Sequence, residues 1–200
     1  MNINSDFIIE ESILVEYTGN EQIVKLPNTV TYIGAYAFKD CKEITAIEIP
    51  NGVIEIGLEA FRGCTNLTSI KIPSSVTSIC KGAFWDCAFL TAIEIPHGVT
   101  SIEASTFWYC SRLTDIKLPS SLTYIGEDAF YSCTIETLNY NAVDAVVSGA
   151  TSASDTPFWA ADVGMLAIGE NVTQLPSYLF CGLNLTQDTL ALPSGLKRIG

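Results

Sequence analysis

Apolar residues recur along the chain at fixed intervals, and Leu67–Cys87 is the clearest copy of the pattern. Its consensus is Leu-x-x-Ile-x-Ile/Leu-Pro-x-x-Val/Leu-x-x-Ile-Gly-x-x-Ala-Phe-x-x-Cys, and copies follow one another every 23 residues. Three residue types keep this step: Pro27, Pro50, Pro73, Pro96 and Pro119; Phe38, Phe61, Phe84, Phe107 and Phe130; Cys41, Cys64, Cys87, Cys110 and Cys133. A shared period in this range indicates a repeat architecture.

The first part of each unit predicts a short β-strand. Leu67–Ile72 is rich in β-branched residues, and Pro73 removes a ladder donor, so strand pairing should stop there. Val76 and Ile79 then direct two further apolar side chains toward the core.

The second part of each unit predicts a turn and a single helical turn. Gly34, Gly57 and Gly126 follow the repeated isoleucine and suit a turn with positive φ. The closing Ala-Phe-x-x-Cys segment is expected to form one turn of α-helix or 3₁₀ helix.

One unit is too small to bury its own apolar face, whereas stacked units bury Leu on Leu, Ile on Ile and Phe on Phe. Adjacent parallel strands would then lie about 4.8 Å apart. The sequence therefore predicts a single α/β solenoid domain over residues 1–200, with a parallel β-sheet on one face and short helical or 3₁₀ turns.

Within this domain we expect four parts. Residues 1–26, with two strands around Gly19-Asn20, form an N-terminal cap, and residues 27–140 form five regular repeats. Residues 141–168 form a degenerate repeat with an inserted polar loop, Ser148–Pro157, and residues 169–200 hold the last full repeat and a truncated one. No C-terminal cap is recognisable. We therefore expect a fragment of a longer chain, or an end covered by a partner or by self-association with a second copy.

The consensus resembles the BspA-type leucine-rich repeat, over roughly residues 24–200. The resemblance implies a curved right-handed solenoid with a parallel sheet on one face. It also implies a surface or secreted bacterial protein that binds host proteins or other cells, as several adhesins of the family do. It carries over no catalytic residues, because the family shares none, and its binding residues occupy variable positions.

Charge and hydropathy limit the partners. The net charge of −12 argues against nucleic acid, whose binding needs clustered Lys and Arg. No apolar run approaches the roughly 18 residues that insertion into a membrane requires. Residues 1–11 lack the basic and apolar regions of a signal peptide. The resemblance favours a secreted or cell-surface location, and the sequence alone leaves a cytoplasmic one open.

The repeated cysteines are the most conspicuous chemical feature. Stacked, in-register Cβ vectors suit a disulfide poorly, and we predict packed free thiols. The chain has no Cys-x-x-Cys pair, and His97 is its single histidine, so we expect neither a metal nor another cofactor.

The solvent face of the strands carries an alternating charge ladder, Glu48, Lys71, Glu94 and Lys117. One interpretation is structural, because opposite charges on neighbouring strands help to fix the register. The other is that this face is a mixed-charge surface that binds protein.

A second candidate surface follows the core phenylalanines: Trp85, Trp108, Tyr131 and, after the loop, Trp159. A row of flat amphipathic rings suits sugar rings or protein hot spots. The alternative is that the rings half-bury one another along the edge of the solenoid.

Catalytic patterns are not recognisable, because the chain has one histidine, no Gly-x-Ser-x-Gly and no Gly-rich phosphate loop. We therefore predict a non-enzymatic binding or adhesion module that recognises protein or glycan through an extended face. The alternative is a structural spacer within a larger repeat protein, with no ligand of its own.

Overall fold

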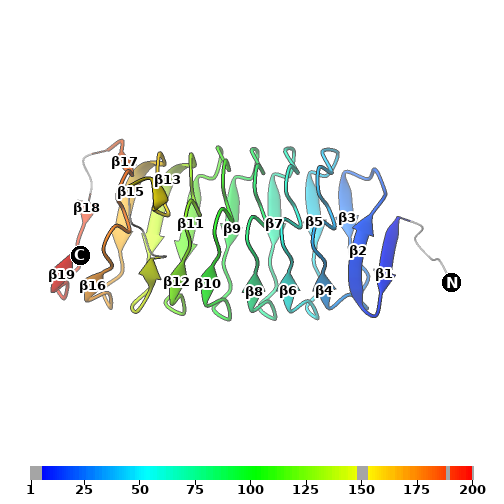
Figure 1. The fold of residues 1–200 in the computed structure, drawn as a ribbon, viewed down its shortest axis with the longest axis horizontal. Helices are drawn as coiled ribbons and strands as arrows, with labels where there is room; N and C mark the ends of the chain where they lie inside the picture. Colours follow the sequence, from blue (N-terminus) through cyan, green and yellow to red (C-terminus); the bar gives the residue numbers. More distant parts are fainter. Residues whose placement is uncertain (1–5, 148–152, 188–189, 200) are drawn as a thin grey trace.

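The computed structural model describes residues 6–147, 153–187 and 190–199. The chain forms a β-solenoid of about eight turns, stacked along one axis (Figure 1). The turns contribute strands to a main sheet and to a second row of mostly shorter strands, and the apolar side chains lie between them. The predicted leucine-rich-repeat solenoid is confirmed.

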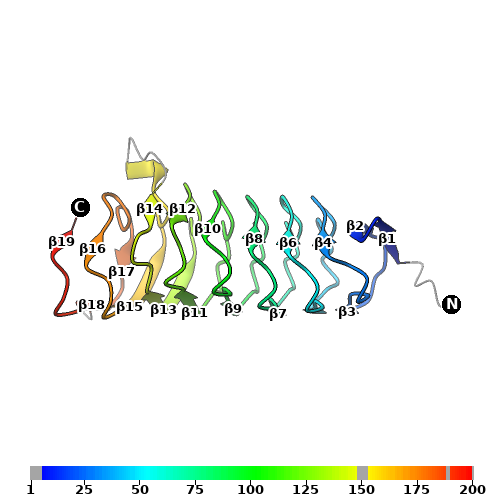
Figure 2. The same ribbon diagram turned by 90° about the horizontal axis from the view of Figure 1, so that it is seen from below.

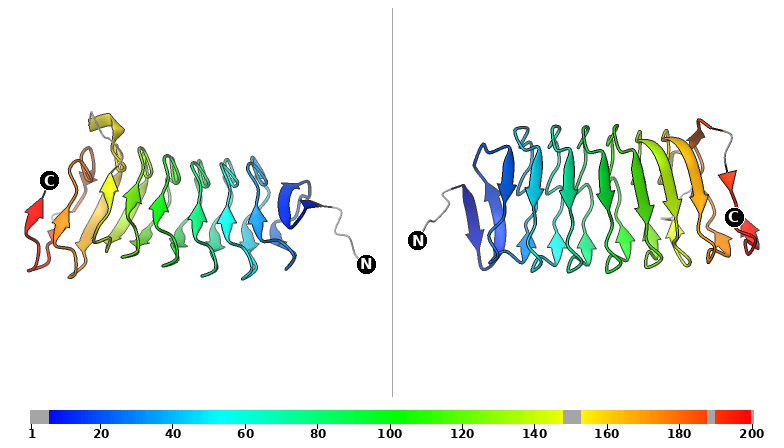
Figure 3. Two further views of the ribbon diagram at one scale, coloured as in Figure 1. Left: turned by 60° about the horizontal axis from the view of Figure 1, so that its bottom comes forward. Right: turned by 180° about the vertical axis from the view of Figure 1, so that it is seen from behind.

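The main sheet is parallel throughout, and its strands lie side by side along the length of the molecule (Figure 3). Ile47, Ile70, Ile93 and Ile116 hold one column of this sheet and point into the core. The strands are β3 (Ile23–Lys25), β5 (Ala46–Glu48), β7 (Ser69–Lys71), β9 (Ala92–Glu94), β11 (Asp115–Leu118), β13 (Thr134–Tyr140), β15 (Asp162–Ile168), β17 (Asn184–Leu185) and β18 (Leu190–Ala191).

A second row of short strands, all but one of them two residues long, was not predicted. Val76 and Ile79 are buried as expected. Ser78 and Ile79 also form a short strand, which pairs with Glu55 and Ile56 on the preceding turn. The strands of this row form separate sheets in the orders β2-β4-β6-β8, β10-β12-β14 and β16-β19. They are β2 (Ile13–Tyr17), β4 (Tyr32–Ile33), β6 (Glu55–Ile56), β8 (Ser78–Ile79), β10 (Ser101–Ile102), β12 (Tyr124–Ile125), β14 (Val146–Val147), β16 (Gln174–Leu175) and β19 (Arg198–Ile199).

The predicted helical turn at Ala-Phe-x-x-Cys is wrong. These segments are hydrogen-bonded turns, and in most units the residues two before and two after the phenylalanine have positive φ. Glu59 (φ 47°) and Gly63 (φ 72°) flank Phe61 in this way. Left-handed residues at this spacing exclude a right-handed helix. Within the described ranges the helical segment is the 3₁₀ helix η1 (Ala153–Asp155), in the inserted region (Figure 2).

The predicted role of three glycines is also wrong. Positive φ occurs at Gly63, Gly82 and Gly182, and not at Gly34, Gly57 or Gly126. A Cβ at Gly57 would lie 2.7 Å from the carbonyl oxygen of Ile33 on the preceding turn. The absent side chain therefore allows two turns to approach closely, rather than allowing a special backbone conformation.

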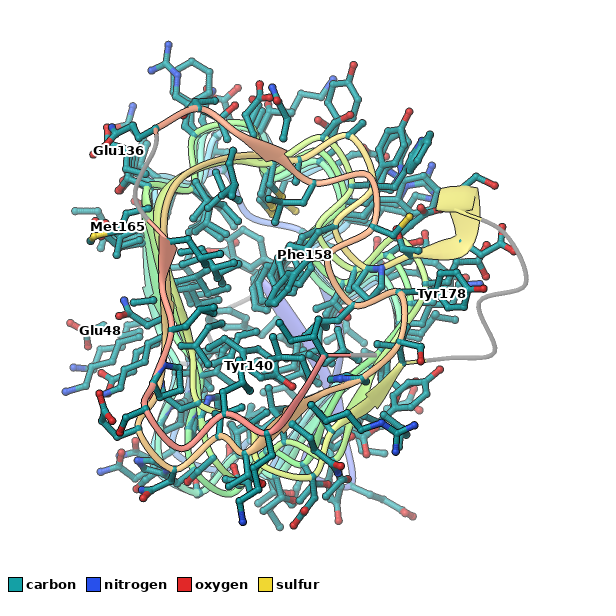
Figure 4. All side chains as sticks on the ribbon, turned by 90° about the vertical axis from the view of Figure 1, so that its left-hand side faces the viewer. Glu48, Glu136, Tyr140, Phe158, Met165 and Tyr178 are labelled. Atoms are coloured by element: carbon teal, nitrogen blue, oxygen red, sulfur yellow. The ribbon has the colours of Figure 1, made fainter. Side chains whose placement is uncertain are left out.

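The centre of the core is a continuous column of aromatic rings. Successive phenylalanines stack with ring centroids 4.7–5.5 Å apart and interplanar angles of 2–13° from Phe38 to Phe158. Phe158 lies near the middle of the cross-section (Figure 4), and Tyr140 packs edge to face on Phe180 with ring centroids 5.7 Å apart. The column runs through Phe7, Tyr17, Phe38, Phe61, Phe84, Phe107, Phe130, Phe158 and Phe180.

The N-terminal end is closed by a hairpin. Strand β1 (Phe7–Glu10) pairs antiparallel with β2, and the two residues between them, Glu11 and Ser12, have φ of 47° and 73°. Gly19-Asn20 also lies between two strands, but these strands, β2 and β3, belong to different sheets. Residues 148–152 of the inserted loop lie outside the described residues.

A boundary divides the solenoid near its middle. Strands β7 and β9 pair only at Ser69 and Ala92, whereas β5–β7 and β9–β11 each pair at three positions. In the second row, β8 and β10 belong to different sheets. Both rows of strands are thus weakened between the same two turns.

Side-chain and main-chain bonds are also lost at this boundary. Ser75 Oγ donates to the carbonyl of Val53 at 2.6 Å, but Gly98 takes the equivalent position one turn later. The amides of Thr100 and Glu103 have no backbone acceptor within the described part of the chain. Contacts at the phenylalanine edge persist, for example from the amide of Phe84 to the carbonyl of Thr106 at 2.9 Å.

We expect Gly57→Ala to lower the free energy of unfolding by about 1–3 kcal/mol, because the added methyl group forces two turns apart. Gly52→Ala is the matched control, since its nearest neighbour outside the adjoining residues would be the oxygen of Val30 at 3.8 Å. This control should be neutral or stabilising by up to about 1 kcal/mol. Urea denaturation measures both variants. Equal stabilities would contradict the close-approach role of Gly57.

Native-state hydrogen exchange should reveal the boundary. We expect the amides of Thr100 and Glu103 to exchange at least about tenfold faster than those of Thr123 and Gly126, because unbonded amides open without breaking the fold. The last two occupy the equivalent positions one turn later, and donate to Thr100 and Ile102 at 2.8 and 2.7 Å. Similar protection at all four amides would contradict a weakened boundary.

Candidate binding surfaces

The charge ladder forms one column on the exposed face of the main sheet. Register places Lys25 beside Glu48, Glu48 beside Lys71, and Glu94 beside Lys117. Lys25, one 23-residue step before Glu48, is therefore also a member of the column. Figure 4 shows Glu48 on this face together with Glu136 and Met165, away from the core.

Most of these charges do not pair. Within the described ranges the column contains one ion pair, between Lys25 and Glu48, whose Nζ and Oε2 atoms are 2.8 Å apart. The carboxylate of Glu48 raises the pKa of Lys25 by accepting its hydrogen bond. Both side chains are largely exposed, so the pair adds little stability. Lys71, Glu94 and Lys117 keep their charges available on the surface.

A shallow depression of about 530 Å³ lies beside these unpaired charges. Ser69, Ala92 and Asp115 form adjacent positions of its lining, and they are paired neighbours on β7, β9 and β11. Lys71, Glu94, Lys117 and Asn139 also line it. The depression crosses the boundary between β7 and β9. Small side chains between charged ones create a recess that a protein surface can enter.

The aromatic row packs largely against itself. The rings of Trp85 and Trp108 meet edge to face at 5.0 Å, and Trp108 stacks on Tyr131 at 5.2 Å. The guanidinium of Arg62 lies 4.3 Å from the ring centroid of Trp85. All three rings are half-buried. This geometry matches the structural interpretation, in which each ring covers its neighbour.

Among the described residues, Trp159 makes no ring contact with the other three members of the row. It is half-buried, and a Cβ built on Gly182 of the next turn would overlap its indole ring. Tyr109 adjoins the row and is more exposed than its members: it is 46% exposed, and its ring centroid lies 4.9 Å from that of Trp108. Sequence reasoning missed Tyr109, because the left-handed backbone that turns it outward (φ 62°) has no signature in the repeat consensus.

Four of the five repeated cysteines are buried, as predicted for packed thiols, and Cys41 is partly buried. Cys64, Cys87, Cys110 and Cys133 are free, and each Sγ donates to the carbonyl oxygen of the phenylalanine 26 residues earlier, at 3.0–3.2 Å. Burial raises the pKa of the Cys87 and Cys110 thiols well above the ordinary value and that of Cys133 to about 12. Such thiols are poor nucleophiles.

Other chemistry is sparse. In the described part of the chain, no group of three or more His, Cys, Asp or Glu side chains could hold a metal ion. None of the described helices is long and apolar enough to cross a membrane. The hydroxyl of Tyr140 is buried without a hydrogen-bond partner, and burial raises its pKa. It lies inside the core and faces no candidate surface.

Residues 31–156 match the BspA type leucine rich repeat region in six copies. The chain therefore belongs to the BspA-type leucine-rich-repeat family. This class of fold builds extended surfaces for protein interaction or scaffolding from stacked turns.

Two solved structures place the chain among similar solenoids. A leucine-rich-repeat protein of T. pallidum is 28% identical with a TM-score of 0.65, over 82% of this chain and 75% of that one. A leucine-rich cell surface protein of Faecalibacterium prausnitzii A2-165 is 21% identical with a TM-score of 0.60, over 97% of this chain and 82% of that one. The second likeness concerns the fold alone. A search of curated protein sequences finds no significant match.

We expect a thiol reagent such as 5,5′-dithiobis(2-nitrobenzoate) to separate the cysteines at pH 8. Cys41, Cys80 and Cys181 are partly exposed, and Cys181 should react first, because burial raises the pKa of Cys80 and raises that of Cys41 to about 11. The four buried thiols should react at least about a hundredfold more slowly until the protein unfolds. Mass spectrometry locates each modified residue. Rapid labelling of Cys87 or Cys110 would contradict the packed core.

Proposed function

We propose that the chain is a non-enzymatic protein-binding module that recognises its partner through the exposed face of the main sheet. The observation that carries this proposal is the recess beside Lys71, Glu94 and Lys117, whose charges make no ion pair among the described residues. Charged side chains that have no ion pair in the free protein can pair with a partner without first breaking an existing pair. They favour a partner surface of complementary charge over one of like charge.

A role in adhesion at the cell surface is the setting that agrees best with this proposal. One solved structure with the same fold is described as a leucine-rich cell surface protein. The net charge of −12 disfavours anionic lipid and nucleic acid as partners. Protein is favoured over glycan, because the rings of Trp85, Trp108 and Tyr131 mostly cover one another instead of presenting free faces.

A binding screen against immobilised extracellular-matrix proteins and a glycan array tests this function. We expect a protein ligand, and we expect the double variant Lys71→Glu/Lys117→Glu to bind it at least about tenfold more weakly. Trp85→Ala/Trp108→Ala should change its affinity less than about twofold. Biolayer interferometry supplies the dissociation constants, and circular dichroism confirms that each variant is folded.

Lys42→Glu/Lys81→Glu is the matched control, because it changes the net charge equally at exposed positions off the main sheet. Its affinity should stay at the wild-type value. Loss of binding in the tryptophan variant alone would move the site to the aromatic row. A screen without any ligand would favour the spacer interpretation.

A further inference from the structure

The charges on the exposed face of the main sheet alternate strictly in sign. Their column runs, one residue a turn, through Lys25, Glu48, Lys71, Glu94 and Lys117. If the alternation served only to hold neighbouring turns in register, neighbouring charges would pair with one another. In the described ranges only Lys25 and Glu48 do so. The alternation is therefore available for a contact with another molecule.

A row of alternating charges is complementary to its own reverse. A two-fold axis parallel to the strands, placed between β7 and β9, brings a second copy face to face with its turns in reverse order. Lys71 then lies opposite Glu94 of the second copy, and Glu48 lies opposite Lys117 of the second copy. Each of these pairs occurs twice, because a two-fold contact is isologous.

Two further acids on this face, Asp115 and Glu136, are compatible with the arrangement. By the register of the main sheet, Asp115 lies opposite Ala46 of the second copy, and Glu136 lies opposite its Gln22. Neither acid therefore meets another acid. A two-fold axis that ran along the charge column instead would set every charge opposite its own copy. The charges thus favour the axis that is parallel to the strands.

The shape of the face also permits this contact. The main-sheet strands lie in a nearly straight row along the stack (Figure 2). Ser69 and Ala92 flank the axis within the recess, and their small side chains leave room for long Lys and Glu side chains to reach across. The turns from β3 to β13 span about 24 Å at about 4.8 Å a strand. An interface of this size is at the low end for specific contacts, where association is weak and reversible.

We propose that a second copy of this chain binds to the exposed face of the main sheet, in an antiparallel dimer whose axis passes between β7 and β9. This inference rests on the proposed function, because it names a partner for the same face. The net charge of −12 opposes association, but most of the acids lie outside the charge column. At about 0.15 M salt, exposed charges more than about 8 Å apart are largely screened.

Sedimentation velocity of the whole chain, at about 5–500 µM in about 0.15 M salt, tests the proposal. We expect the mass to rise with concentration and to stop at that of a dimer. Two variants with the wild-type net charge test the axis. Lys71→Glu/Glu94→Lys keeps opposite charges facing each other across the axis, so its dissociation constant should stay within about threefold of the wild type. Glu48→Lys/Lys71→Glu sets like charges against each other, and should weaken the dimer at least about tenfold.

The proposal is overturned if the wild type stays monomeric over this range, if the mass passes that of a dimer, or if the two variants associate equally. Thermal melting by circular dichroism shows that both variants fold. The ligand screen keeps this outcome separate from that of the proposed function. A monomeric wild type whose Lys71→Glu/Lys117→Glu variant loses a ligand from the screen keeps the binding face and removes the second copy as its partner. A dimer that responds to the two variants as expected stands even if the screen yields no ligand.

Discussion

Backbone pairing between successive turns is the constraint on which the rest of the structure depends. Parallel strands hydrogen-bond at a separation of about 4.8 Å, so each residue of a turn meets its own counterpart on the next. The phenylalanine rings follow this spacing at 4.7–5.5 Å from Phe38 to Phe158. An insertion cannot enter the stack without breaking these columns. The step from Phe130 to Phe158 is longer, and the 3₁₀ helix η1 of this step projects from the stack (Figure 2).

The same constraint separates residues that carry the scaffold from residues that remain free to bind. The aromatic row is part of the scaffold, because its rings on adjacent turns pack against one another. The charge column behaves differently. Its members are also neighbours, but long side chains in water lose little by staying apart, and only Lys25 and Glu48 meet closely. The exposed face of the main sheet therefore has more side chains without a partner in the solenoid than the aromatic row has, among the described residues.

The regularity of the columns is interrupted between β7 and β9, and the recess of the sheet face crosses this interruption. The phenylalanine edge stays bonded there, while both rows of strands lose pairing. The recess on the exposed face of the main sheet thus lies where strand pairing between successive turns is reduced.

The sequence by itself determined the solenoid, its 23-residue step, the strand ending near Pro73 and the buried thiols, because these follow from side chains that must pack on their own copies. Only the tertiary structure decided the rest. The phenylalanine segment turns through left-handed residues such as Glu59 instead of forming a helix. Gly57 serves the approach of two backbones, and Lys71 stays unpaired although Glu48 lies beside it. Each of these features depends on distances between neighbouring turns. The residue types along a single turn do not specify those distances.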